Sequence, residues 1–151
     1  MKTLRMLSLL GILLQSAQGL HAQTLDTQAA SIADLEASSE AALALVYRTQ
    51  LAIETCESLY QKTGAFQLNR EIQVLRLMGA EAAQLADDLN AHADEAIIAE
   101  HKQQLEQLLL QSEEYRRQLT SLFRTQRDLL LKLADVRRTA YYLQSLLNTP
   151  S

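Results

Sequence analysis

The sequence predicts an all-α protein, built either as a long antiparallel helical hairpin or as a three-helix coiled-coil-like bundle. Two observations support this prediction. The composition favours helices over strands, because the 151 residues include four Gly, one Pro and no Trp and are rich in Ala, Leu, Gln and Glu. In addition, apolar residues recur at spacings of three and four over long segments, which is the pattern of amphipathic helices.

Residues 1–22 show the three-part pattern of a secretory signal peptide. Two basic residues precede an apolar run (residues 6–14), and a segment of small residues follows and ends at Ala22. We expect cleavage after Ala22, with cleavage after Gly19 as the alternative. The apolar run is about half the ~20 residues that a membrane span needs. The mature chain, residues 23–151, is therefore expected to be one helical domain in the periplasm or outside the cell.

The first helix is expected over about residues 25–62, where apolar and small residues repeat every seven positions. Lys62 and Gly64 form a stop signal, because a cation suits the negative end of a helix and glycine tolerates the left-handed conformation beyond it. Cys56 is the single cysteine and falls on an apolar position. We expect a buried thiol, with an intermolecular disulfide as the alternative.

Two further helices are expected. The second covers about residues 69–89, with Asn69 as its N-cap, and a turn follows in the polar segment 87–94. The third covers about residues 95–147 and has the clearest heptads in the chain. At 1.5 Å per residue, this helix is about 80 Å long, which is too long for a compact globule.

An antiparallel register between the first and third helices supports the hairpin. If paired residues have numbers that add to 175, apolar positions such as Val46 and Leu129 meet. The same register places Thr49 opposite Gln126, where the two polar side chains can satisfy each other. The rival is an up-down-up three-helix bundle, in which the last helix runs parallel to the first.

Charge is unevenly distributed along the chain. Residues 23–115 include 16 acidic and 5 basic side chains, whereas residues 116–151 include 2 acidic and 7 basic ones. We expect the two parts to attract each other within the fold, and an anionic partner is the alternative. Because the net charge is -4, nucleic acid is not expected as a partner.

The last third of the chain holds the candidate interaction residues. Tyr141 and Tyr142 lie off the heptad seam, and exposed aromatic side chains are common in protein interfaces. Arginines alternate with leucines nearby, a pattern that fits a partner helix or an anionic membrane surface. The alternatives are packing of the tyrosines on a third helix and pairing of the arginines with the acidic first helix. The predicted partner-binding residues are Leu110, Arg117, Arg124, Leu131, Arg138, Tyr141 and Tyr142.

The sequence contains no recognisable catalytic or metal-binding signature. It lacks inward-facing Glu-x-x-His motifs, a nucleophile elbow and a phosphate-binding glycine loop. Asp88, His92 and Glu95 share a helix face, but a solvated turn is their expected environment. His101 is expected to be a tolerated polar residue in the core. We therefore expect no enzymatic activity, no cofactor and no small-molecule substrate.

These features predict a structural or interaction protein of a bacterial cell envelope, one subunit of a larger assembly such as a secretion or conjugation apparatus. Its partners are expected to be other protein subunits or further copies of itself. By architecture, an exported helical hairpin with a distal head is similar to the minor pilus subunits of type IV secretion and conjugation systems. The alternative functions are a periplasmic holdase chaperone or stress-binding protein, and a protein that binds a membrane or cell surface.

Overall fold

The computed structural model describes residues 34–148, and this part of the chain consists of four α-helices without strands. Within this described part, the first helix covers residues 34–63. It is followed by α2 (Phe66–Asn90), α3 (Glu95–Leu122) and α4 (Arg127–Leu147). The all-α prediction is therefore confirmed. The predicted signal peptide and the predicted start of the first helix lie outside the described residues.

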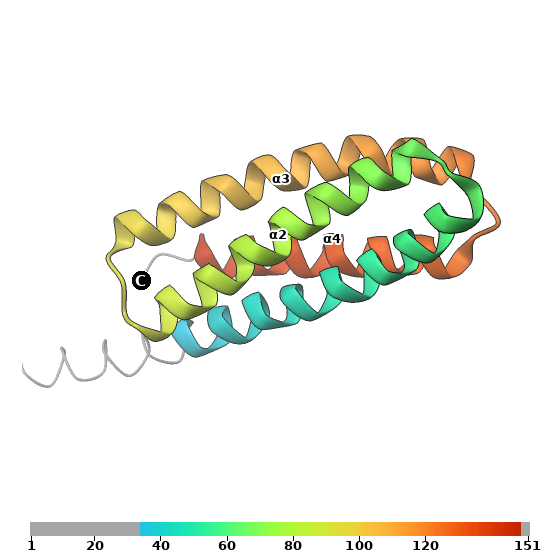
Figure 1. Ribbon diagram of the computed structural model, residues 1–151. Coiled ribbons are helices and arrows are strands. Elements are labelled where there is room, and N and C mark those ends of the chain that lie inside the picture. Colours follow the sequence, from blue (N-terminus) through green and yellow to red (C-terminus); the bar gives the residue numbers. More distant parts are fainter. Residues whose placement is uncertain (1–33, 149–151) are drawn as a thin grey trace, which may run out of the picture. The chain divides into compact units, whose positions relative to one another are not determined.

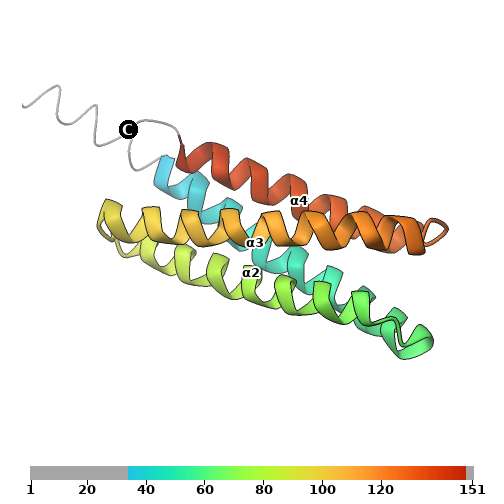
Figure 2. The ribbon, with the colours of Figure 1, turned by 90° about the horizontal axis from the view of Figure 1, so that it is seen from above.

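Residues 35–148 form an antiparallel bundle in which each helix reverses the direction of the one before it (Figure 1). The helix α2 packs extensively against α3, and α3 packs along α4. The first helix (cyan to green in Figure 1) lies beside α4, because Arg48 Nη1 donates a hydrogen bond to Thr139 and Lys132 Nζ donates one to Thr55 at 2.9 Å. Figure 2 shows the four helices from above.

The first turn contains the predicted glycine stop. Gly64 has φ +65°, and its N–H donates a hydrogen bond of 2.7 Å to the carbonyl four residues earlier. The predicted start of the next helix is wrong, because α2 begins at Phe66 and Asn69 lies inside it. The hydroxyl of Thr63 accepts a hydrogen bond from the N–H of Ala65 at 3.3 Å. This bond closes the turn without a cap from Asn69.

The second turn, residues 91–94, falls within the predicted polar segment. His92 adopts φ 53°, so the left-handed residue that ends α2 is a histidine here instead of the usual glycine. The N–H of Ala93 donates a hydrogen bond to the Asp88 carbonyl at 2.9 Å. His92 therefore serves the turn geometry.

The predicted helix over residues 95–147 is wrong, because the segment forms two helices separated by residues 123–126. No Gly or Pro marks the break, but residues 120–126 include Thr, Ser and Phe, which are weaker helix formers than Ala or Leu. Folding back lets α4 pack beside both the first helix and α3, whereas a continuous helix offers its apolar face fewer neighbours. The large apolar side chains that α4 buries are Leu129, Leu133, Val136 and Leu143.

The antiparallel direction predicted for the first helix and the C-terminal segment is confirmed, but the predicted register is wrong. The hydrogen-bonded pairs Arg48–Thr139 and Thr55–Lys132 join residues whose numbers add to 187, not 175. This shift of 12 residues follows from the turn at residues 123–126, because the turn places α4 independently of α3.

The core lies between the four helices and is largely aliphatic. Each helix contributes a fully buried leucine, and these include Leu45, Leu75, Leu119 and Leu143. Cys56 is 0% exposed, which confirms the predicted buried thiol. Burial, followed by the nearby charges of Glu71 and Glu57, raises the pKa of this thiol to about 12. None of the helices within residues 34–148 is both long and apolar enough to cross a membrane.

Candidate interaction surface

All seven predicted partner-binding residues are exposed. They are Leu110 and Arg117 on α3, Arg124 in the following turn, and Leu131, Arg138, Tyr141 and Tyr142 on α4. The exposed fraction reaches 66% for Leu110, 62% for Leu131 and 57% for Tyr142. Because the predicted helix is two helices, the seven residues do not form one continuous row.

Three of these residues share the outer face of α4. Leu131, Arg138 and Tyr142 follow one another at spacings of seven and four, which places them on one side of an α-helix. Arg127 continues this row four residues before Leu131. The side chain of Arg138 is 73% exposed, although its Nη2 donates a hydrogen bond to Asp135 at 3.0 Å. We call Arg127, Leu131, Arg138 and Tyr142 the α4 ridge.

Tyr141 faces α3 and is not part of the α4 ridge. Its hydroxyl donates a hydrogen bond to Glu113 Oε1 at 2.5 Å, and Arg137 Nε donates one to the same oxygen at 3.0 Å. The Arg137 guanidinium also lies 5.2 Å from the centre of the Tyr141 ring. The hydrogen bond from Tyr141 and then that from Arg137 lower the pKa of Glu113. Tyr141 therefore joins α3 to α4, which agrees with its alternative role of packing on a neighbouring helix.

The expected ion pairs between the C-terminal arginines and the acidic first helix do not form among the described residues. Arg137 pairs with Glu113 of α3, and Glu57 of the first helix pairs with Arg76 of α2 at 2.6 Å. One reason is the position of α4, which is displaced along the first helix by 12 residues from the predicted register.

An apolar groove of about 540 Å³ lies between the first helix and α2. Buried Ile53 and Leu75 form part of its floor. Leu43 and Tyr47 line it from the first helix and are 54% and 65% exposed. The groove is thus a concave surface whose apolar walls are open to solvent.

Gly79 is the reason that the first helix and α2 approach closely beneath this groove. A Cβ at position 79 would lie only 2.8 Å from Thr49 Oγ1, so no other residue fits without movement of Thr49. The adjacent Ala80 also has a small side chain and lines the groove. Two small residues on α2 therefore leave the hollow beside Leu43 and Tyr47.

An acidic border accompanies the groove on the first helix. Glu36, Glu40 and Glu54 are exposed. They share a face with Leu43 and Tyr47, because residues 36, 40, 43, 47, 50 and 54 follow one another at spacings of three and four. Prediction from the inward-facing heptads misses this surface. The sequence nevertheless contains a signal for this surface, because residues at heptad spacing also repeat on the opposite, exposed side of the same helix.

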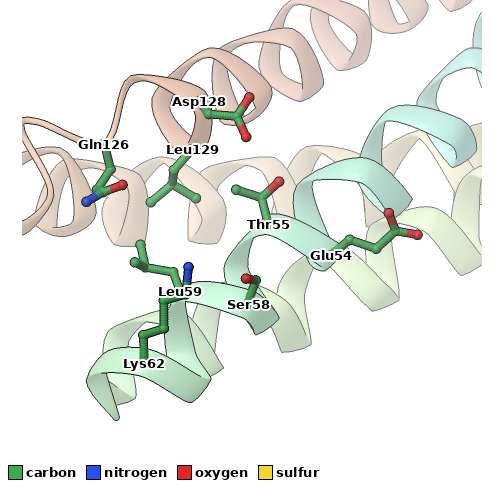
Figure 3. Close-up of a pocket in the computed structure, with 8 residues that line it drawn as sticks. All are labelled: Glu54, Thr55, Ser58, Leu59, Lys62, Gln126, Asp128 and Leu129. Atoms are coloured by element: carbon green, nitrogen blue, oxygen red, sulfur yellow. The ribbon is translucent and has the colours of Figure 1, made fainter.

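A second hollow, of about 300 Å³, lies where the end of the first helix meets the turn before α4 (Figure 3). Leu59 and Leu129 approach each other there from the two helices, while Glu54 points away (Figure 3). Lys62 and Asp128 also line the hollow. Apolar side chains with isolated charged groups at the edge are typical of the contact between two packed helices.

His101 joins α2 to α3 through two carboxylates. Its Nδ1 lies 2.5 Å from Glu81 Oε1, and its Nε2 lies 2.5 Å from Asp88 Oδ2. Both nitrogens must carry a proton to donate to both acids, so the imidazolium form fits this geometry. Burial lowers the pKa of His101, but the hydrogen bonds to Glu81 and Asp88 raise it by more. Within residues 34–148, no group of three or more His, Cys, Asp and Glu side chains is placed to hold a metal ion.

Glu71 is a buried acid that the sequence-based prediction misses. It is 0% exposed, and its Oε1 accepts a hydrogen bond from the Ser112 hydroxyl at 2.7 Å. Among the described residues, its Oε2 has no hydrogen-bond partner. Burial raises the pKa of Glu71 to about 7, against the opposing effects of Ser112 and the charge of Arg116. The sequence signal is its position in one row with the buried side chains of Leu68 and Leu75.

Comparison with protein-family models, with curated proteins and with solved structures finds no match to this chain. A functional interpretation therefore depends on the surfaces described above.

Proposed function

We propose that the protein is an exported structural subunit of a cell-envelope assembly, such as a secretion or conjugation apparatus, and that it contacts its partner through the α4 ridge. The main support is the exposure of large apolar side chains beside arginines on one helix face. Leu131, which is 62% exposed, lies between Arg127 and Arg138, and Tyr142, which is 57% exposed, follows Arg138 by one helical turn. Apolar side chains gathered on one exposed face are typical of a surface that a partner covers.

The choice of cation in the C-terminal part supports a protein partner. Residues 116–148 contain six arginines and one lysine. Arginine is enriched in protein interfaces and lysine is depleted, because the guanidinium is weakly hydrated, stacks on aromatic rings and forms planar hydrogen bonds. Tyrosine is enriched in interfaces as well, and Tyr142 supplies such an aromatic surface.

Export is the other part of the proposal, and it is tested separately. The signal-peptide pattern of residues 1–22 predicts that the mature protein begins at Gln23. N-terminal sequencing of the protein from the periplasmic or extracellular fraction is expected to read Gln-Thr-Leu. Recovery of the full-length chain from the cytoplasm alone would contradict export.

Site-specific photo-crosslinking in the native host tests the contact. A photoreactive amino acid in place of Tyr142 is expected to yield adducts with an assembly subunit in the envelope fraction, identified by mass spectrometry. The control is the same amino acid in place of Gln111, which is exposed on α3 and belongs to neither the α4 ridge nor the apolar groove. Equal adducts at both positions, or none at either, would argue against the α4 ridge as an interface.

Binding to an anionic membrane surface is a second candidate, favoured by the alternation of arginine with exposed Leu131 and Tyr142. This function predicts sedimentation with anionic liposomes at low salt and release at high salt. The matched control replaces Arg117, Arg124 and Arg138 with Gln. If the native protein stays in the supernatant at low salt, this candidate is excluded.

A further inference from the structure

We propose that the partner of the α4 ridge is a second copy of this chain, and that the ridge of one copy docks into the apolar groove of the next. This inference rests on the proposed function, because it names the partner of the same surface. Two different surfaces of one chain then form a single interface.

The two surfaces match in shape and length. The groove is concave and has apolar walls, whereas the ridge is the convex outer face of a helix. Leu131 and Tyr142 are 11 residues apart, which corresponds to about 16 Å along α4. The first-helix residues that line the groove run from Leu43 to Ile53, about 15 Å along that helix. Both exposed apolar residues of the ridge can therefore contact the groove at once.

The charges of the two surfaces are complementary. The first helix, residues 34–63, carries five acidic and two basic residues, a net charge of -3. In contrast, α4 carries four basic and two acidic residues, a net charge of +2. Glu36, Glu40 and Glu54 lie on the exposed face of the first helix beside the groove, whereas Arg127 and Arg138 belong to the ridge. Arg76 also lines the groove, but its charge is paired with Glu57 at 2.6 Å. Opposite charges favour this pairing and guide the approach of the two copies.

Charge also argues against pairing of like surfaces. Two ridges face to face bring arginines together, and two grooves bring glutamates together. The interface that remains joins unlike surfaces, so a pair of copies keeps one free groove and one free ridge. An interface of this kind extends into a ring or an open chain of subunits. Because the contact involves only a few helical turns, we expect each single contact to be weak.

Sedimentation equilibrium of the mature protein over a range of concentrations tests this inference. The average mass of the native protein is expected to rise with concentration and to rise less at high salt. The groove variant Ala80→Arg places a large cation where the ridge would dock. The ridge variant combines Leu131→Glu with Tyr142→Glu. All three positions are exposed, so thermal unfolding by circular dichroism is expected to show an intact fold.

Each variant alone is expected to associate at least about ten-fold more weakly than the native protein. An equimolar mixture is expected to form 1:1 dimers that do not grow, because the groove variant keeps its ridge and the ridge variant keeps its groove. The control Gln111→Arg adds the same charge to an exposed position of α3, a helix that does not line the groove, and is expected to associate like the native protein.

Three results would overturn the inference. They are a native protein that stays monomeric at every concentration, a mixture that forms no dimer, and a groove variant that associates normally. The crosslinking experiment separates this failure from failure of the proposed function. If position 142 crosslinks only to a different envelope protein, the proposed function stands and self-association is excluded.

Discussion

The carboxyl group of Glu71 accepts a hydrogen bond from Ser112 and lies near Arg116, yet its burial dominates its ionisation. In the unfolded chain this acid titrates at its ordinary pKa of 4.5, whereas in the fold the pKa is about 7. Between these two pH values the unfolded state loses a proton that the folded state keeps. Stability from this group is therefore complete below about pH 4.5 and is lost as the pH rises to about 7. The loss amounts to roughly 3 kcal/mol.

The variant Glu71→Gln removes this titration and keeps the shape of the side chain. At about pH 8 we expect its free energy of unfolding to exceed that of the native protein by up to roughly 3 kcal/mol, with little difference at about pH 4. Urea unfolding at the two pH values measures the effect. Glu114→Gln on the exposed side of α3 is the matched control and is expected to change neither value. Parallel pH profiles for Glu71→Gln and the native protein would contradict the assignment.

His101 gives a second pH dependence with a distinct origin. Its pKa is raised because the hydrogen bonds to Glu81 and Asp88 outweigh burial. The stability that it contributes is complete below its ordinary pKa of 6.5 and is lost as the pH rises through the raised value. NMR titration of the imidazole is expected to show a pKa above 6.5, and Glu81→Gln is expected to lower it. An unchanged pKa in that variant would show that Glu81 does not hold the ring.

Cys56 and Glu71 show what the sequence predicts at single positions. Cys56 falls on an apolar heptad position, so its burial follows from periodicity alone. Glu71 also falls in an apolar row, but its charge favours the surface in any sequence-based prediction. Its burial depends on Ser112 and Arg116 of α3, which reach it only in the folded bundle. A contact between distant segments cannot be read from the local pattern.

At the scale of the helices, local chemistry determines some ends and packing determines others. Gly64 ends the first helix through its own left-handed conformation, and the sequence predicts this end. The break at residues 123–126 has no such residue. It forms because α4 gains two neighbouring helices by folding back, and this gain depends on the whole bundle. The sequence therefore predicts the first boundary and misses the second.

Gly79 and Thr49 provide a test of the contact between the first helix and α2. Alanine is favoured over glycine in helices by about 1 kcal/mol, but the added Cβ at position 79 meets Thr49 Oγ1. Moving this hydroxyl disturbs its hydrogen bond of 2.8 Å to the Val46 carbonyl. We expect Gly79→Ala to destabilise the native protein by about 1 kcal/mol or more.

The double-mutant cycle gives the control for this prediction. In a Thr49→Ala background the obstacle is removed, so Gly79→Ala is expected to raise the free energy of unfolding instead of lowering it. Denaturant unfolding of the four proteins measures the coupling between the two positions. If Gly79→Ala has the same effect in both backgrounds, the close approach does not limit this position.

At the scale of the whole molecule, the break before α4 limits how well the sequence predicts the arrangement of the candidate interaction residues. The exposure of all seven candidate residues agrees with the prediction. Their division between α3, a turn and α4 does not follow from the heptads, because it depends on the break. The apolar groove depends on a different contact, because it requires the close packing of the first helix on α2, which the heptad pattern does not predict.

The register between the first helix and α4 is the feature on which the placement of these surfaces depends. In the structure, paired residues have numbers that add to about 187, so Glu40 lies near the level of Asn148. A register with a sum of 175 instead pairs Glu40 with Asp135, a displacement of about 18 Å along the helix. Spin labels at positions 40 and 148 are therefore expected to be close, and labels at positions 40 and 135 are expected to be far apart. Electron paramagnetic resonance distances check both pairs, and the buried Cys56 can stay in place because its raised pKa and 0% exposure protect it from labelling. If positions 40 and 135 are instead the closer pair, the result would support the hairpin with a continuous third helix.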